Sequence, residues 1–310
     1  MILVELCESY TDLVLVVGGG TTTVSKTAEL VDLSLNPENN CPQPADPPVQ
    51  ILRAVGAFVN GRATVCGGED NPNCYYYDFQ IGRWLYTFPL DTERWYSASA
   101  VIDDNTWWIA GGEDRSTGPL GTSIVYSGSG FFRPGPELPE PAFGACALKL
   151  NATHVFYAGG RNESFITAGA QNFKTAYLLE WATGTWTRLP DMPTGAGLHT
   201  CSQSGGEVYV LGGFTFTNVP SVSFVFSLET MTWRDGPAIP VDDIIYYGIP
   251  TIQHDRDSFT YVGGHLSGGS TSGIFTFDDK SFGWKVNKKS LSEDRGTHVA
   301  IPVPRDVANC

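Results

Sequence analysis

The chain has 310 residues and carries 19 Lys and Arg against 33 Asp and Glu, which gives a net charge of −14 at pH 7. This charge argues against non-specific binding to nucleic acids or anionic membranes, because both polyanions would repel the protein. No apolar run reaches the length of about 18 residues that a membrane span needs. The 35 Gly, the 20 Pro and the lack of a sustained helical apolar period predict an all-β protein.

A Gly-Gly doublet follows a short apolar run six times along the chain. The first glycines lie 49, 44, 48, 53 and 51 residues apart, and a period of about 50 residues is typical of a β-propeller blade. Each apolar run is then a strand buried on both faces, which the backbone leaves through glycines with positive φ. The six copies are Val16–Gly19, Val65–Gly68, Ile109–Gly112, Tyr157–Gly160, Leu211–Gly213 and Tyr261–Gly264.

In chain order, strands are predicted at Leu13–Val17 and Glu29–Leu33, followed by an outer strand that ends at Cys41. The second unit shows the complete pattern, with predicted strands at Arg53–Val59, Arg62–Cys66 and Cys74–Asp78 and an outer strand at Trp84. The later units repeat this order, with inner strands at Arg94–Val101, Phe143–Leu150, Leu198–Ser202 and Ile244–Ile249. Each unit is therefore predicted to be a blade of four antiparallel strands, called a to d from the axis outward.

The two chain ends complete the ring. A strand a at about residues 295–303 has no strand b after it, and the strand b at about residues 13–17 has no strand a before it. Pairing these two strands would remove both free edges. We therefore expect residues 1–310 to form one six-bladed β-propeller, closed by this pairing. Cys7 and Cys310 lie just outside the two strands, and a disulfide between them would stabilise the closure by about 2–4 kcal/mol; alternatively, one or both are free.

The repeat unit resembles the kelch repeat. The resemblance rests on the Gly-Gly after an apolar strand, on the strands Tyr75–Asp78 and Phe275–Asp278, and on a tryptophan that follows strand c in four units, at Trp84, Trp186, Trp233 and Trp284. It covers nearly the whole chain and implies a kelch-type propeller, whose functions are diverse. Details around Cys66, Cys74 and Cys310 are similar to kelch proteins secreted by invertebrates. The first unit has Cys41 near the expected tryptophan, and the third has Phe131-Phe132.

The other cysteines suggest two further disulfides. Cys66 and Cys74 flank the b–c loop of one blade, so a bridge would lock that loop. Cys146 and Cys201 lie in the inner strands of adjacent blades and could meet near the axis; otherwise they are small buried hydrophobes. Cys41 is then left over, free or shared with a partner chain. Metal ligation by cysteine is not expected, because no CxxC pair occurs.

Cysteines and sequons together indicate an extracellular protein. The sequons at Asn151 and Asn162 fall in predicted turns, where they would be accessible for glycosylation. The stretch Met1–Cys7 lacks the basic region and the apolar length of a signal peptide, so we expect a chain whose leader is missing.

No pattern of catalytic residues is recognisable. HExxH, Gly-x-Ser-x-Gly and Walker motifs are absent, and the five histidines are scattered. Galactose-oxidase-like kelch enzymes need copper held by His and Tyr, and no motif identifies such a set. Plant specifier proteins need Glu-x3-Asp-x3-His for iron; Asp294 and His298 have the last spacing, but Ser290 stands where Glu is required. A non-catalytic protein without a cofactor is therefore expected.

The b–c loops are the long loops, and in a four-stranded blade they emerge on the same face as the d–a connections. Recognition tends to reside in long loops on a rigid scaffold, and this face also receives the starts of the inner strands, where Arg and Tyr are typical of binding hot spots. The candidate binding residues are Arg53, Arg94, Trp95, Tyr96, Phe143, His199, Tyr246, Tyr247, His265, Arg295 and His298.

Each of these candidates also has a purely structural interpretation. Arg53, Arg94 and Arg295 recur at one place in the repeat and could instead satisfy buried carbonyls between blades. Two acidic pairs after Gly-Gly, Glu69-Asp70 and Glu113-Asp114, could form a Ca²⁺ site or could simply solvate turns. The resulting hypothesis is an extracellular scaffold that binds a protein or peptide partner, or assembles with itself, through the b–c/d–a face. The alternatives are a carbohydrate or small-ligand binder and, next, a metal-dependent oxidase.

Overall fold

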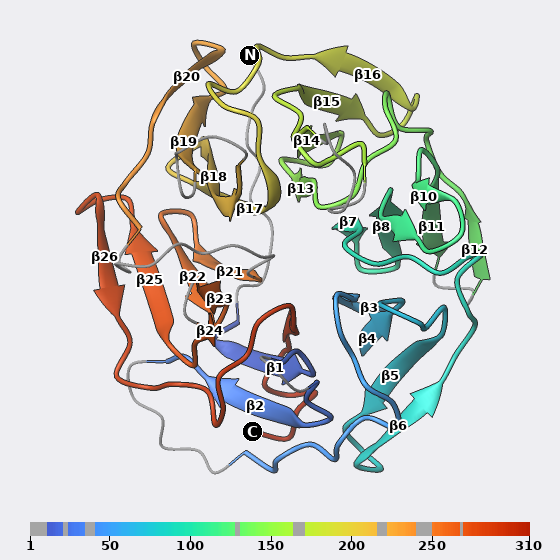
Figure 1. Cartoon of the computed structure of the whole chain (residues 1–310). Coiled ribbons are helices and arrows are strands. Elements are labelled where there is room, and N and C mark those ends of the chain that lie inside the picture. Colours follow the sequence, from blue (N-terminus) through green and yellow to red (C-terminus); the bar gives the residue numbers. More distant parts are fainter. Residues whose placement is uncertain are drawn as a thin grey trace.

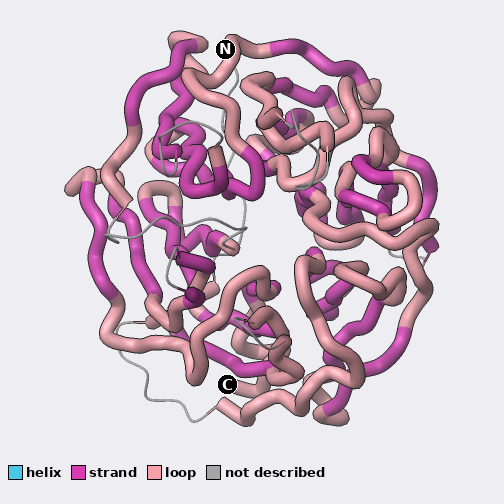
Figure 2. The backbone as a smooth tube through the Cα atoms, viewed as in Figure 1, coloured by secondary structure: helices cyan, strands magenta, loops and turns pink. Residues whose placement is uncertain are grey.

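The fold is a ring of six β-sheets, shown by a computed structural model that describes residues 11–20, 24–34, 41–127, 131–163, 171–215, 222–239, 250–266 and 269–310. The sheets stand around a central axis like the blades of a propeller (Figure 1). Figure 2 shows strands and loops along the described chain and no helix. Within these ranges, nothing forms a helix long and apolar enough to cross a bilayer.

Five blades have all four strands in the described residues, each sheet antiparallel and in the expected order from axis to rim. Blade 2 consists of β3 (Val55–Val59), β4 (Arg62–Cys66), β5 (Cys74–Asp78) and β6 (Arg83–Tyr86). Blade 3 consists of β7 (Ala98–Asp103), β8 (Thr106–Ala110), β11 (Ser123–Ser127) and β12 (Phe131–Pro134). Blade 4 consists of β13 (Cys146–Lys149), β14 (His154–Ala158), β15 (Ala176–Glu180) and β16 (Thr185–Arg188).

Blade 5 consists of β17 (Gly197–Ser204), β18 (Glu207–Phe214), β19 (Val222–Ser227) and β20 (Thr232–Asp235). Blade 6 consists of β21 (Thr251–Asp255), β22 (Ser258–Val262), β25 (Ile274–Asp278) and β26 (Gly283–Val286). The expected inner strand Ile244–Ile249 lies outside the described residues. The inner strand that the structure describes in this blade is β21, which begins directly after Pro250, and a proline is tolerated before or at the start of such a strand. Two short hairpins extend b–c loops: β9 (Glu113–Asp114) with β10 (Gly118–Pro119), and β23 (His265–Leu266) with β24 (Gly269–Ser270).

Blade 1 is built from both ends of the chain, as predicted. β1 (Leu13–Val17) pairs with β2 (Ala28–Asp32) on one side and with β27 (Val299–Pro302) on the other. All five residues of β1 are fully buried, because alternate side chains enter the core on opposite faces of the sheet. Burying one such side chain contributes about 1.5–3 kcal/mol, so the closing strand is among the most strongly held parts of the ring.

The predicted Cys7–Cys310 disulfide is wrong, because Cys310 is bonded to Cys41. Cys41 precedes the connector into blade 2 and packs, together with Cys310, against the core between blades 1 and 2. Cys7 itself lies outside the described residues. The disulfides Cys66–Cys74 and Cys146–Cys201 are formed as expected, the first across β4 and β5 and the second between blades 4 and 5.

An ion pair reinforces the same closure. Arg305 donates to both carboxylate oxygens of Asp32, at 2.6 and 3.2 Å, and thereby joins the segment after β27 to the end of β2. Burial raises the pKa of Asp32, but the hydrogen bonds from Arg305 and Ser34 outweigh it and lower this pKa to about 2. The carboxylate is therefore ionised, and the pair intact, at any physiological pH.

Each pair of neighbouring blades shares one apolar cluster in the described residues, so the core is divided into six seams. The repeated tryptophans pack at the outer ends of these seams, and three of them also hold the connector that leads into their own blade. The indole nitrogens of Trp84, Trp186 and Trp233 donate to the carbonyls of Ala45, Glu137 and Pro190, each at 2.8 Å.

The Gly-Gly doublets join one blade to the next. The amide of the second glycine donates to a carbonyl just before the next inner strand: Gly68 to Arg94 at 2.9 Å and Gly112 to Ala142 at 2.9 Å. The same bond recurs from Gly19 to Ile51, Gly160 to Ala196 and Gly264 to Arg295. The first glycine lies against the same backbone, so a Cβ on Gly111 would be 2.3 Å from the Ala142 oxygen. A side chain at this position would push the two blades apart.

We expect Gly111→Ala to lower the free energy of unfolding by about 3–5 kcal/mol, because it adds both a φ penalty and a clash at a seam. Gly61→Ala is the matched control: its φ of +69° resembles the +60° of Gly111, but nothing lies within 4 Å of its added Cβ. The control should cost only about 1–2 kcal/mol. Urea unfolding monitored by tryptophan fluorescence gives both values, and equal losses would contradict the role assigned to the doublet.

Candidate functional site

In the five blades where the described residues include the start of the inner strand, that start carries a residue with left-handed backbone, and these five residues lie around one end of the axis. We call Arg53, Tyr96, Gly144, Leu198 and Thr297 the mouth ring; their φ angles lie between +52° and +65°. The amides of four of them donate to the carbonyl of the preceding one: Arg53 to Thr297 at 3.0 Å, Tyr96 to Arg53 at 3.0 Å, Gly144 to Tyr96 at 2.8 Å and Leu198 to Gly144 at 2.6 Å. Backbone hydrogen bonds thus fix the mouth, while the side chains there differ from blade to blade.

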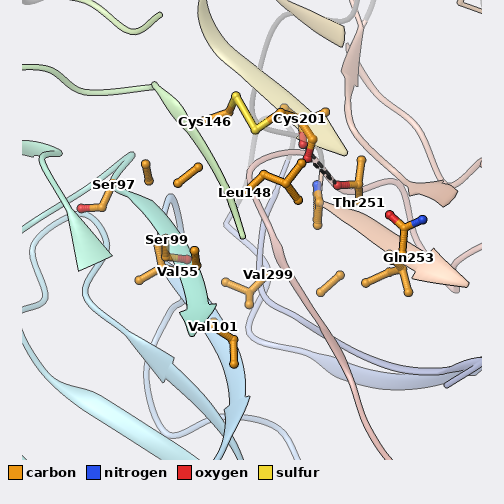
Figure 3. Close-up of a pocket in the computed structure, with 18 of the residues that line it drawn as sticks. Val55, Ser97, Ser99, Val101, Cys146, Leu148, Cys201, Thr251, Gln253 and Val299 are labelled. Atoms are coloured by element: carbon orange, nitrogen blue, oxygen red, sulfur yellow. Dashed lines mark hydrogen bonds between the residues drawn. A yellow bond between two sulfur atoms is a disulfide. The ribbon is translucent and has the colours of Figure 1, made fainter. Parts of the chain in front are cut away.

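The mouth ring surrounds a small pocket of about 110 Å³, whose wall also includes Ala54, Ser97, Ala145, His199 and His298. Ala54, Ser97, Ala145, His199 and His298 also line a central channel of about 440 Å³, at the end next to the mouth ring. Figure 3 shows this channel between the inner strands, with the Cys146–Cys201 disulfide in its wall. Of the predicted binding residues, the structure therefore brings Arg53, Tyr96, His199 and His298 together at the axis.

Charged and aromatic side chains form a continuous arc beside this mouth. We call Asp70, Arg115, Glu69, Arg53, Tyr96, Phe143, Arg161 and Phe214 the mouth arc. Glu69 lies 3.0 Å from Arg53 and 3.7 Å from Arg115, and Arg53 lies over the Tyr96 ring at 5.1 Å. The rings of Tyr96 and Phe143 are 6.3 Å apart, and Arg161 lies over the rings of Phe143 and Phe214.

The arc is exposed at one end and buried at the other. The side chains of Arg115, Asp70 and Arg53 are 60%, 66% and 34% exposed, whereas Phe143 and Arg161 are fully buried. Arg115 and Asp70 are joined at 2.8 Å across the b–c loops of blades 3 and 2. The b–c loops of blades 2 and 3 therefore present accessible charge of both signs, held by rigid strands beneath.

Arg94 and Arg295 hold the fold together rather than form a binding surface: both donate hydrogen bonds to buried backbone carbonyls, the alternative role that the sequence analysis gives them. Arg94 donates to the carbonyls of Gly111 and Thr122, at 3.0 and 3.1 Å, and pairs with Asp91 at 2.9 Å. Arg295 donates to the Gly18 carbonyl at 2.7 Å and pairs with Glu29 at 3.1 Å. Both guanidinium groups are buried and close the Gly-Gly ends of their blades. Arg53 does not share their place in the repeat: it aligns with Tyr96 and Thr297, so the three arginines were wrongly grouped.

The remaining candidates are dispersed. Trp95 is buried, and its indole donates to Glu113 at 2.9 Å. His265 lies in the β23–β24 hairpin within 3.2 Å of Ser270. Tyr246 and Tyr247 lie outside the described residues.

Protein donors engage the four acidic residues considered for Ca²⁺. Arginines contact Glu69 and Asp70, the Trp95 indole contacts Glu113, and hydroxyls of Thr92, Ser116 and Thr117 contact Asp114. Across the described part of the chain, no three His, Cys, Asp or Glu side chains group as metal ligands would.

His199 and His298 occupy equivalent positions at two seams. Each ring leans on the first glycine of the neighbouring blade, Gly159 or Gly263. Both side chains are 4% exposed, and neither ring makes a hydrogen bond of good geometry, although the Ala158 and Val262 carbonyls lie close by. Burial lowers the pKa of His199 to about 4; burial and the nearby Arg295 lower that of His298 to about 3. Both imidazoles are therefore uncharged at neutral pH.

The comparisons with known proteins agree with this architecture. No family model matches the chain. A stretch of 172 residues is 26% identical to the Kelch-like protein terF of Aspergillus terreus, and the match covers 51% of this chain and 36% of that protein. The chain thus matches little more than a third of that relative's length. The match and the six-bladed ring together support a kelch-repeat propeller. Such a propeller suggests a protein-binding scaffold, and kelch propellers are typically non-catalytic.

The two buried histidines predict a specific acid sensitivity. Their folded pKa values lie below the ordinary value of 6.5. The contribution of the two uncharged rings to the free energy of unfolding is therefore fully present above pH 6.5, and it is lost as the pH falls below 6.5 toward the folded pKa values. We expect the free energy of unfolding to drop by roughly 2–4 kcal/mol between pH 7 and pH 5.

Urea titrations at several pH values measure this loss. A His199→Gln/His298→Gln variant should show a much flatter pH profile over the same range, because neither glutamine titrates. His154→Gln, at the β13–β14 turn, serves as the control and should keep the wild-type slope. If the double variant kept that slope as well, other groups would be responsible for the acid sensitivity.

Proposed function

We propose that the protein is a non-catalytic extracellular scaffold that recognises a protein or peptide partner through the face of the b–c and d–a loops. The single observation that carries this proposal is the exposed part of the mouth arc. Arg115, Asp70, Glu69 and Arg53 come from two blades and converge beside the channel mouth. Arg53 belongs to the hydrogen-bonded mouth ring, and ion pairs hold Glu69, Asp70 and Arg115 to it and to one another, so binding costs little ordering of the site.

The chemistry of this surface fits a protein partner. Arginine and tyrosine are enriched among interface residues whose truncation costs most, and Arg53, which lies over the Tyr96 ring, combines a positive charge with an aromatic surface. Glu69 and Asp70 bring negative charge within the same patch. A partner with both signs of charge, such as a folded protein surface or an extended peptide, would complement it.

The extracellular location rests on the cysteines and the sequons. Three disulfides favour an oxidising environment. Asn162 is exposed on the face of the mouth, and Asn151 lies at the β13–β14 turn on the opposite face. A glycan on Asn162 would border the recognition surface and one on Asn151 would leave it clear.

Mass spectrometry of the unreduced protein, made in a eukaryotic secretory host, tests this location. We expect peptides joined through Cys41–Cys310, Cys66–Cys74 and Cys146–Cys201, together with glycans on Asn151 and Asn162. Reduced thiols at these six positions, or unmodified sequons in a secreted product, would contradict an extracellular role.

The binding face is tested by an Arg53→Ala/Arg115→Ala variant. Cross-linking in the native extracellular fluid, followed by mass spectrometry, identifies the partner of the wild-type chain. The affinity of that purified partner should then fall by about 30-fold or more in the variant, which corresponds to about 2 kcal/mol for a hot spot.

The matched control is Arg83→Ala/Arg133→Ala, which removes two exposed arginines from the outer strands β6 and β12. This control should bind as the wild type does, and both variants should unfold at the wild-type urea concentration. Arg94 is unsuitable for such a test, because its buried hydrogen bonds hold blade 3 together. A partner that binds the face variant and the wild type equally would refute the assigned face.

A further inference from the structure

The turn between β3 and β4 holds the one Asn-Gly pair in the sequence. Asn60 and Gly61 are its two central residues, and their φ angles are +53° and +69°. A two-residue hairpin of this kind requires positive φ at both positions, and asparagine followed by glycine meets the requirement best. The turn therefore explains why these two residues stand together, and it also places a chemically reactive pair at the surface.

The reactivity of the pair comes from the glycine. The backbone nitrogen that follows an asparagine can attack the side-chain amide carbon, and a Cβ on the attacking residue obstructs this approach. Gly61 has no Cβ, it is exposed, and nothing lies within 4 Å of the position that a Cβ would occupy. None of the described backbone hydrogen bonds uses the Gly61 amide as donor. The attacking nitrogen is therefore unobstructed.

Other asparagines in turns are followed by residues that hinder this attack. Asn71 precedes Pro72, whose nitrogen carries no hydrogen. Asn105, in the equivalent β7–β8 turn, precedes the β-branched Thr106. Asn105 is itself exposed, so it is the residue that follows, and not exposure, that distinguishes the β3–β4 turn.

We propose that Asn60 is a site of spontaneous deamidation in the folded protein. The Gly61 nitrogen loses its proton and bonds to Cγ of Asn60, the side-chain amide leaves as ammonia, and a succinimide ring forms. Water then adds to either of the two ring carbonyl carbons and opens the ring. One opening gives an aspartate, and the other gives an isoaspartate, in which the main chain runs through Cγ. The net change consumes one water and releases one ammonia.

Either product alters a contact between blades. The Asn60 amide donates to the Asp104 carbonyl of the β7–β8 turn at 2.5 Å, on the face opposite the mouth. The new carboxylate stands next to a turn that already carries the exposed carboxylates of Asp103 and Asp104, and like charges repel. Isoaspartate also lengthens the turn by one backbone atom, which a two-residue hairpin does not accommodate. Deamidation therefore loosens the junction of blades 2 and 3 and is independent of the partner surface.

Ageing of the intact protein at neutral and at mildly alkaline pH tests this site. Peptide mapping by mass spectrometry should show conversion of Asn60 to the acid within the tryptic peptide Ala54–Arg62, and isoaspartyl methyltransferase should label that peptide. The reaction should be faster at alkaline pH, because the Gly61 nitrogen must lose its proton. Asn105 is the internal control and should stay unmodified over the same period.

Gly61→Ala adds the obstructing Cβ and should slow the conversion of Asn60 about tenfold. The wild-type chain unfolded in urea is aged in parallel, so that reaction through transient unfolding is measured separately. Conversion that occurs only in urea, or that Gly61→Ala leaves unchanged, would overturn the proposal.

The loosening of the blade junction has its own measurement. The modified fraction, separated by anion exchange, should unfold at a lower urea concentration than the fresh protein. Asn60→Asp should reproduce the part of this loss that comes from charge. An unfolding midpoint that deamidation leaves unchanged would refute the effect assigned to the turn.

Discussion

The ring depends on a backbone contact between blades that tolerates no side chain. In five of the six doublets, those whose partner lies among the described residues, the second glycine donates its amide to the neighbouring blade, and the first lies against the same carbonyl. Apolar burial in the six seams supplies the larger driving force, but it is not directional. The glycine contact sets the distance at which neighbouring sheets meet and repeats the same geometry around the axis. Tryptophan, buried arginine and histidine then fill the spaces that this spacing leaves.

The same constraint explains why the mouth can vary without loss of the fold. The residues of the mouth ring are joined through their amides and carbonyls, so their side chains take no part in the bonds that hold them. Arginine, tyrosine, glycine, leucine and threonine all occupy this position, and four of the five accept a left-handed φ that glycine adopts more readily. Strain of this kind is common at functional sites. The side chains that tolerate it here are those that face the mouth pocket.

Much of this architecture could be predicted from spacing alone. Six doublets at near-constant intervals predict the number of blades, and an inner strand without a following partner predicts closure by the chain ends. Cys146 and Cys201 were paired correctly because both lie in inner strands of neighbouring blades. Cys41 was missed because its position depends on how the outer segment of blade 1 meets the C-terminal segment, which no repeat describes.

The site was harder to predict than the fold. Arg53 and Arg94 look equivalent by residue type, but the first lies two residues before β3 and the second four residues before β7. An inner strand begins at the residue that pairs with the last residue before the Gly-Gly doublet: Val55 with Cys66 in blade 2, and Ala98 with Ala110 in blade 3. The different positions of the two arginines therefore become visible only once this pairing is known. His199 lies in the inner strand β17, whereas His298, expected in an inner strand as well, lies one residue before β27. Their burial at the seams could not be read from sequence, because it depends on the neighbouring blade.

Closure by strands from opposite ends also has a consequence for biosynthesis. β1 emerges from the ribosome with every side chain apolar and must wait for β27 before its inner edge is covered. During that interval the nascent chain exposes an unpaired strand edge, which is the kind of surface that recruits chaperones or other chains. Pairing between strands so far apart in sequence is slow, because the chain loses the entropy of loop closure before the stabilising contacts form. Maturation of the ring is therefore a late event, completed and then sealed by Cys41–Cys310.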